Sequence, residues 1–105
     1  MKAAKRKRLE ANGWAVGRVQ DFIGLSDAEA AIIDLRLGLA ESLRSLRQRV
    51  GLSQVELARR LGSSQSRIAK MEAGDASVSI ELLLRALLCL GTTCRQLGRM
   101  ISRAA

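Results

Sequence analysis

Several kinds of chemistry are excluded by what the sequence lacks. It has no histidine, the commonest general base and metal ligand in proteins, and it has no proline. Its two cysteines, Cys89 and Cys94, are too few for a secreted disulfide framework or for zinc bound by two cysteine pairs. We therefore expect reduced thiols, no metal, no cofactor and no enzymatic activity.

Long apolar runs are also missing. The most apolar stretch, from Ile80 to Leu90, is interrupted by Arg85 and is shorter than the roughly 20 residues that cross a bilayer. The basic start KRKR is followed by LEANGW and not by an apolar segment, so a secretory signal is not predicted. The sequence therefore predicts a cytoplasmic protein without membrane association.

Leucine, alanine and arginine dominate the 105 residues, and this composition favours helices over strands in one domain with a single core. The net charge of +8 is unevenly distributed: +5 over residues 1–8, −4 over 9–42, +5 over 43–74 and +2 over 75–105. A basic segment such as 43–74 suits binding to a phosphate backbone. The charge distribution is equally consistent with basic residues that only keep the surface solvated.

The first 38 residues are predicted to form two parts, a basic tail at residues 1–10 and an N-terminal extension at residues 11–38. The tail is expected to act either as a solubilising segment or as an arm that contacts DNA. Trp14 and Phe22 are the only aromatic residues. They are expected either to pin the extension to the domain or to form a patch for a partner.

A long apolar stripe follows in the extension and beyond it. Gly24 is expected to end a short helical turn, and the capping box Ser26–Glu29 is expected to start a helix. Apolar side chains then recur every three or four residues until Gly51, at Ile32, Leu35, Leu39, Leu43, Leu46 and Val50. Gly38 lies within this stripe and predicts either one long helix with a weak point or two helices that meet there.

Shorter helices with their own start and stop signals are predicted after Gly51. A second capping box at Ser53–Glu56 opens a helix of about eight residues that Gly62 ends. Two further helices are expected after Ser79 and after the capping box at Thr93–Gln96. The last helix is expected to turn Leu97, Met100 and Ile101 inward, and Arg95, Arg99 and Arg103 outward.

One short helix, from Gln65 to about Ala73 with Ser64 as its N-cap, has a polar side with no structural explanation. At 100° per residue, one side carries Gln65, Ser66, Ala69 and Lys70. Ile68 and Met71 point the opposite way and are expected to be core residues. Two short helices joined by a tight turn that contains glycine describe a helix-turn-helix.

The stretch GLSQVELARRLGSSQSRIAKMEAG, residues 51–74, closely resembles the XRE family, the phage-repressor and Cro type of helix-turn-helix. The resemblance extends over five helices from about Leu39 to Ile101. It implies an all-α, five-helix, lambda-repressor-like DNA-binding domain at residues 39–105, with the motif at 53–73 and an N-terminal helical extension. The whole chain is also similar to small bacterial regulators, some of which resemble HigA-type antitoxins.

The resemblance implies roles for individual residues in binding DNA. The expected contacts to base edges in the major groove come from Gln65, Ser66, Ala69 and Lys70. The expected contacts to backbone phosphates come from Gln54, Ser64 and Arg67, with Arg44, Arg59 and Arg60 as weaker candidates. Arg47 and Glu72 are expected to form a partly buried structural ion pair.

Two functions follow from this resemblance. The first is a sequence-specific transcriptional regulator, a repressor that binds double-stranded DNA as a homodimer and is thereby associated with the nucleoid. The sequence does not decide which surface forms the dimer. The candidates are the leucine-rich helix near residues 80–90, the last helix and the extension. The alternative is an antitoxin that binds a toxin protein and represses its own operon. The extension, acidic between Asp21 and Glu41, would then contact the toxin, and tight packing of the extension onto the domain would weaken this alternative.

Overall fold

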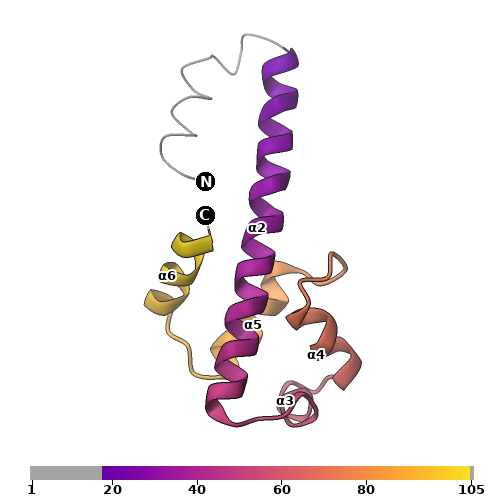
Figure 1. The fold of residues 1–105 in the computed structure, drawn as a ribbon, viewed down its shortest axis with the longest axis vertical. Helices are drawn as coiled ribbons and strands as arrows, with labels where there is room; N and C mark the ends of the chain where they lie inside the picture. The colour runs from indigo at the N-terminus through magenta and orange to yellow at the C-terminus, as the bar shows by residue number, and fades with distance from the viewer. Residues whose placement is uncertain (1–17, 105) are drawn as a thin grey trace.

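The computed structural model describes residues 18–104, with side chains from Ser26 onward. The predicted basic tail at residues 1–10 and Trp14 lie outside the described residues, and so does the side chain of Phe22. Within residues 18–104 the chain forms five helices and no strand, which confirms the all-α prediction. Figure 1 shows one long helix beside a cluster of four short ones.

The long helix, α2 (Arg18–Val50), has 33 residues and starts earlier than predicted. It passes through Gly24, which was expected to end a turn, and through Ser26, which was expected to cap a new helix. Both predictions were wrong because a cap signal does not break a helix by itself. The stretch has no proline, so no residue in it costs more than about 1 kcal/mol in a helix interior. The helix-forming residues on both sides therefore keep α2 continuous.

Gly38 does not divide α2, so the alternative of one continuous helix is the one the structure adopts. Its role lies in packing. A Cβ atom at residue 38 would lie 2.6 Å from the Cβ atom of Ala104, the last residue of α6 (Cys94–Ala104). Glycine therefore allows the end of α6 to approach the α2 backbone closely.

Three further helices, α3 (Gln54–Leu61), α4 (Gln65–Glu72) and α5 (Ile80–Cys89), begin and end close to the predicted residues. The Ser53 hydroxyl accepts a hydrogen bond from the Glu56 N–H at 3.0 Å, and the Glu56 carboxylate accepts one from the Ser53 N–H at 2.8 Å. This reciprocal pair is the predicted capping box. Gly62 has a φ of +65° and ends α3 in the left-handed conformation, which other residues disfavour.

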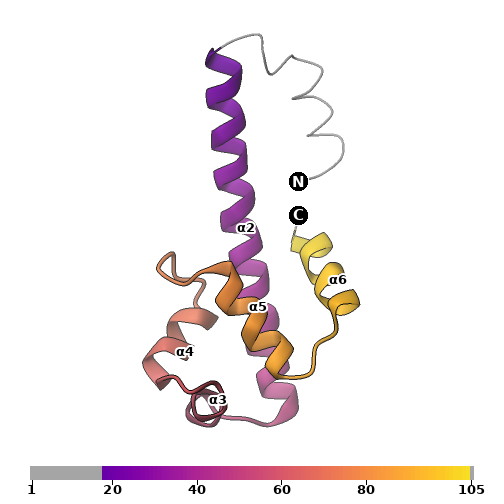
Figure 2. The ribbon, with the colours of Figure 1, turned by 180° about the vertical axis from the view of Figure 1, so that it is seen from behind.

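The core lies where α2 packs against α4, α5 and α6, while α3 packs on α4. Figure 2 shows α5 crossing α2 on the face hidden in Figure 1. The side chains that are almost completely buried come from four helices: Leu39, Leu43, Leu57, Ile68, Met71, Leu83 and Leu87. This single cluster fixes α3 and α4 against the second half of α2.

Three predicted core positions are exposed: Ile32, Val50 and Ile101. Val50, the last residue of α2, is 48% exposed. Ile32, part of the predicted inward stripe, is 44% exposed because the first half of α2 extends beyond the other described helices. Ile101 is 38% exposed because α6 turns Leu97 and Met100 toward α2 and leaves Ile101 at the edge of that contact. No helix among the described residues is both long enough and apolar enough to span a membrane.

Candidate nucleic-acid interface

The position of α4 is fixed from its inner side. Ile68 and Met71 lie in the core and are at most 1% exposed. Leu57 and Ala58 of α3 are also buried, and the small Ala58 side chain lets the two helices approach closely. An eight-residue helix is marginal alone, so these tertiary contacts hold α4 in place.

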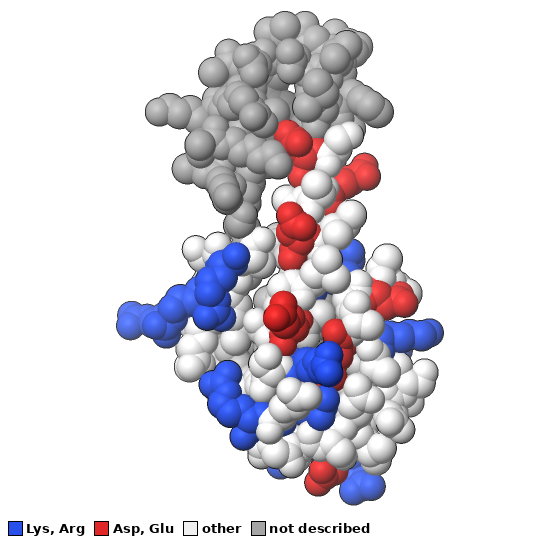
Figure 3. Space-filling view, viewed as in Figure 1, with Lys and Arg blue, Asp and Glu red and all other residues white. Residues whose placement is uncertain are grey.

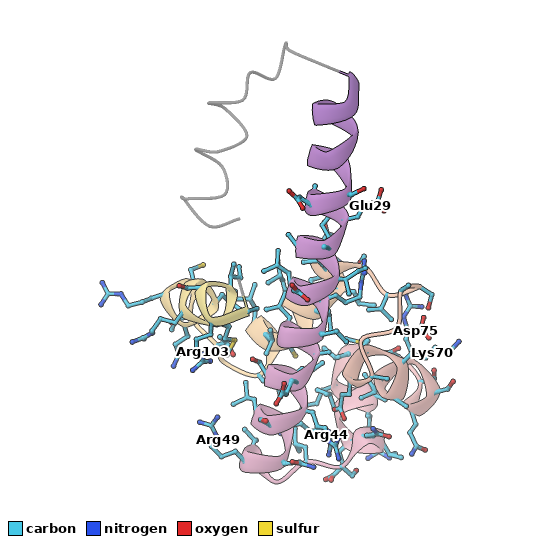
Figure 4. The ribbon with its side chains drawn as sticks, turned by 45° about the horizontal axis from the view of Figure 1, so that its top comes forward. Glu29, Arg44, Arg49, Lys70, Asp75 and Arg103 are labelled. Atoms are coloured by element: carbon cyan, nitrogen blue, oxygen red, sulfur yellow. The ribbon has the colours of Figure 1, made fainter. Side chains whose placement is uncertain are left out.

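The outer side of α4 is polar and open to solvent. All four side chains predicted to contact bases are exposed on it: Gln65, Ser66, Ala69 and Lys70. Figure 4 shows Lys70 pointing away from the molecule on the side of α2 opposite to α6. The side chains that the pattern placed together thus do share one accessible face. Their amide, hydroxyl and ammonium groups can donate hydrogen bonds to acceptors on bases, and the amide and hydroxyl oxygens can also accept them.

A hollow of about 280 Å³ lies between this face and the loop that leads to α5. It is lined by Ser64, Ser66, Arg67, Lys70, Ser77 and Val78. Ser77 was not among the predicted site residues, although the Asp75–Ser77 turn was a sequence signal for an ordered loop. Its N–H donates to the Asp75 carboxylate at 2.8 Å, and hydrogen bonds from the Ser77 side chain and backbone lower the pKa of Asp75.

The residues predicted to contact phosphates lie on three helices: Arg44 on α2, Gln54, Arg59 and Arg60 on α3, and Ser64 and Arg67 at the start of α4. Ser64 accepts a hydrogen bond from the Arg67 N–H at 3.2 Å, which leaves the Ser64 hydroxyl proton available to another acceptor. The guanidinium-bearing candidates are all exposed and have no ion pair among the described residues: Arg44, Arg59, Arg60 and Arg67. These cations would be free to neutralise phosphates.

A buried polar cluster joins three elements behind α4. The Arg47 Nε atom donates to Glu72 at 2.5 Å, and Arg47 Nη2 donates to the other carboxylate oxygen at 3.0 Å. Arg47 Nη1 also donates to the Leu52 carbonyl at 2.7 Å. The hydrogen bond to Glu72 raises the pKa of Arg47 above its ordinary value, which keeps the guanidinium charged. The ion pair implied by the resemblance is therefore present and bidentate.

Gln54 belongs to the same cluster, which the sequence did not indicate. Its Nε2 atom donates to Glu72 Oε1 at 3.1 Å, and the side chain is half-buried. One amide hydrogen is thus used inside the protein and the second remains for a phosphate, so the predicted phosphate contact stays a prediction. The cluster ties the end of α2 and the start of α3 to the last residue of α4.

The described residues contain no group of three or more histidine, cysteine, aspartate or glutamate side chains that could hold a metal ion. Cys89 and Cys94 are exposed and carry free thiols.

Comparison with known proteins gives one matching family model, described as a helix-turn-helix, which covers residues 43–97. Among curated proteins, an uncharacterized HTH-type transcriptional regulator from Haemophilus influenzae is 38% identical over 60 residues. The alignment covers 57% of this chain and 61% of that relative, so less than two thirds of the relative is matched. No solved structure matches the chain.

Proposed function

The chain belongs to the XRE-type helix-turn-helix family, and we propose that it is a sequence-specific DNA-binding transcriptional regulator that represses transcription as a homodimer. In this proposal α4 lies in the major groove, where Gln65, Ser66 and Lys70 meet base edges. Gln65 is suited to adenine N6 and N7, Lys70 to guanine O6 and N7, and the Ala69 methyl group to the thymine methyl.

The observation that carries the proposal is the division of α4 into two sides. Ile68 and Met71 are buried, and Glu72 is held by three hydrogen bonds, so the helix has a rigid support. The opposite side contains no large apolar side chain, and its side chains are exposed. Contacts to base edges require a rigid helix that presents small polar groups. A mobile helix would lose conformational entropy on binding, and this cost would offset part of the binding free energy.

Charge supports the same conclusion. The segment 43–74 carries seven basic and two acidic residues, and Glu72, one of the two acids, is neutralised by Arg47. The exposed arginines around α4 would release counterions on binding a duplex.

A homodimer is proposed because one short helix reads only a few base pairs. Two copies related by a two-fold axis would place two recognition helices about one helical turn of DNA apart, and this doubles the contacted sequence. Repression would then follow from occupancy of a promoter by the dimer.

Binding of duplex DNA measured by fluorescence anisotropy over a salt series tests the DNA-binding proposal. The affinity should fall steeply with salt, and Arg67→Gln should make the slope of log affinity against log salt shallower by about 1. Arg85→Gln, which changes an exposed arginine of α5 that pairs with Glu81, is the matched control and should leave the slope unchanged. An affinity that does not depend on salt would rule out this mode of binding.

An antitoxin function is a second proposal, and the first half of α2 favours it. The upper part of α2 extends beyond α3–α6 and exposes Ile33, and Leu37, which lies against the loop residue Gly74, is still half-exposed. A toxin would bind there and leave α4 free for the operator. Co-expression with the product of an adjacent gene tests this proposal, because a stable complex that Ile33→Asp disrupts is expected.

A further inference from the structure

The first half of α2 presents an apolar ridge to solvent. We define residues 26–37 as the projecting segment: Figures 1 and 2 show the upper part of α2 extending past the other described helices, and Leu37, at the base of the segment, lies against Gly74 in the loop between α4 and α5. Ile33 is 53% exposed and Leu37 49% exposed, and their four-residue spacing puts them on one side of the helix. Asp34 is exposed and borders the same side. The Ile33 and Leu37 side chains offer an apolar contact surface to a partner.

A groove with the complementary character lies on the other part of the molecule. Two adjoining hollows of about 440 and 410 Å³ lie between the second half of α2 and α6, and both are lined by Arg49, Met100 and Arg103. Leu46 and Leu90 add apolar surface to the second hollow, and Arg99 adds a third guanidinium. We call this surface the arginine groove.

The cations of the arginine groove have no partner in the described part of the chain. Arg49, Arg99 and Arg103 form no ion pair or hydrogen bond among residues 18–104. Glu41 is the one acidic residue in the groove lining, and it lies at the α2 side of the first hollow. Three neighbouring guanidiniums with little compensation favour an acidic occupant.

DNA bound at α4 is not the occupant that the geometry favours. Figure 4 shows Arg49 and Arg103 on one side of α2, and Lys70 on the other. A duplex that lies along α4 therefore faces away from the groove. Figure 3 shows acidic side chains along the upper part of α2 and basic side chains over α6, so the two surfaces also match in charge.

We propose that the projecting segment of one copy docks into the arginine groove of a second copy, and that the second copy does the same to the first. Ile33 and Leu37 would pack over the apolar floor at Met100, while Asp34 would pair with the guanidinium of Arg103. Each surface is used once by each copy, so the contact closes as a two-fold dimer and does not extend into a filament. This inference rests on the homodimer of the proposed function and names its surface.

The reciprocal contact makes a specific prediction for charge reversal. Asp34→Lys should weaken self-association about tenfold or more, and so should Arg103→Glu, because each puts like charges opposite each other twice per dimer. An equimolar mixture of the two variants should regain a dimer. In the mixed pair the two substituted side chains meet each other with opposite charges, and the unchanged Asp34 meets the unchanged Arg103.

Sedimentation velocity of the full chain without DNA measures these associations over a range of protein concentrations. Glu81→Lys and Arg85→Glu on α5 are the matched controls, since they reverse charges at exposed positions outside the groove lining. Both controls should self-associate as the unmodified chain does. Ile33→Asp should also produce monomers, and circular dichroism establishes that each variant keeps its helices.

The outcomes separate the possible failures. Recovery of the dimer in the mixture supports the proposal, and monomeric single variants that do not recover together would overturn the reciprocal geometry. A dimer that survives all three substitutions would overturn the proposed surface but leave the homodimer intact. If the unmodified chain is monomeric at every concentration, both this inference and the homodimer fail, and a toxin becomes the better occupant of the projecting segment. DNA binding by α4 is measured separately in the salt series, so a failure of the proposed dimer surface can be told apart from a failure of DNA binding.

Discussion

A substitution at Gln65 gives the strictest test of base recognition at a single residue. Gln65 is the first residue of α4, its side chain is open to solvent, and no hydrogen bond inside the described chain holds it. Gln65→Ala should cost about 1–3 kcal/mol of binding free energy on the preferred DNA sequence and relax one base position. Affinity measured for all four bases at each position checks this, and an unchanged preference would show that Gln65 does not read sequence.

Gln54→Ala is the matched comparison on the phosphate side. The second amide hydrogen of Gln54 should contact the backbone, so this variant should weaken binding to all duplexes alike. A loss confined to one DNA sequence would contradict the phosphate contact. Because Gln54 also donates to Glu72, thermal unfolding should accompany the binding measurement.

The Arg47–Glu72 pair should matter for stability and not for base preference. Its side chains are only 11% and 4% exposed, so Glu72→Leu would leave a buried guanidinium without its carboxylate. We expect a loss of about 3–5 kcal/mol in the free energy of unfolding. The double variant Arg47→Met/Glu72→Leu should lose less, because no unpaired charge remains. Urea unfolding of the two variants checks this, and equal losses would contradict it.

The capping box of α3 should appear in the pH dependence of stability. The hydrogen bond from the Ser53 N–H lowers the pKa of Glu56 in the folded protein below its ordinary value of 4.5. Its contribution is therefore complete above pH 4.5 and is lost as pH falls through the lowered pKa of the folded state. The stability difference between the unmodified chain and Glu56→Gln should shrink from about pH 6 toward about pH 3. A difference that stays constant with pH would contradict this account.

At the scale of the element, Gly38 allows α6 to approach α2. Alanine in place of glycine in a helix interior normally stabilises a protein by about 1 kcal/mol. Here the new Cβ atom would meet the Cβ atom of Ala104, so Gly38→Ala should lose that gain or become destabilising. The double variant Gly38→Ala/Ala104→Gly removes the clash and should be more stable than Gly38→Ala alone. Equal melting temperatures for the two variants would show that the close approach is not the constraint.

The elements differ in how far the sequence predicted them. The short helices α3, α4 and α5 were located to within about one residue because caps at Ser53, Ser64 and Ser79 and the stop at Gly62 are local signals that no distant contact opposes. The start of α2 was wrong because the same kind of signal, at Ser26, lies within helix-forming sequence on both sides.

Contacts between helices were less predictable from the sequence than the residues at which the helices begin and end. The hydrogen bond from Gln54 to Glu72 depends on how α3 crosses α4, which no local pattern encodes. Ile32 and Ile101 have helical spacing that suits a core, but burial needs a neighbour, and spacing does not reveal where neighbours end. The accessible side of α4 was predictable because two buried side chains are enough to orient a short helix.

At the scale of the whole molecule, α2 joins two surfaces with separate proposed roles. Its Arg36 side chain donates to the Val78 carbonyl at 3.0 Å, in the loop that borders the hollow beside α4. Gly74, with a φ of +70°, lies against Leu37, and a Cβ atom there would come within 2.6 Å of that side chain. The base of the projecting segment is thus connected to the loop at the candidate DNA interface.

Selection of bound duplexes from a random DNA pool is the decisive test of sequence recognition by α4, because it requires sequence preference and reports the symmetry of the site at the same time. We expect enrichment of a two-fold symmetric site, with half-sites about one helical turn apart and one base position that relaxes in Gln65→Ala. Recovery of DNA without any enriched sequence, or an enriched sequence that Gln65→Ala leaves unchanged at every position, would contradict recognition by α4.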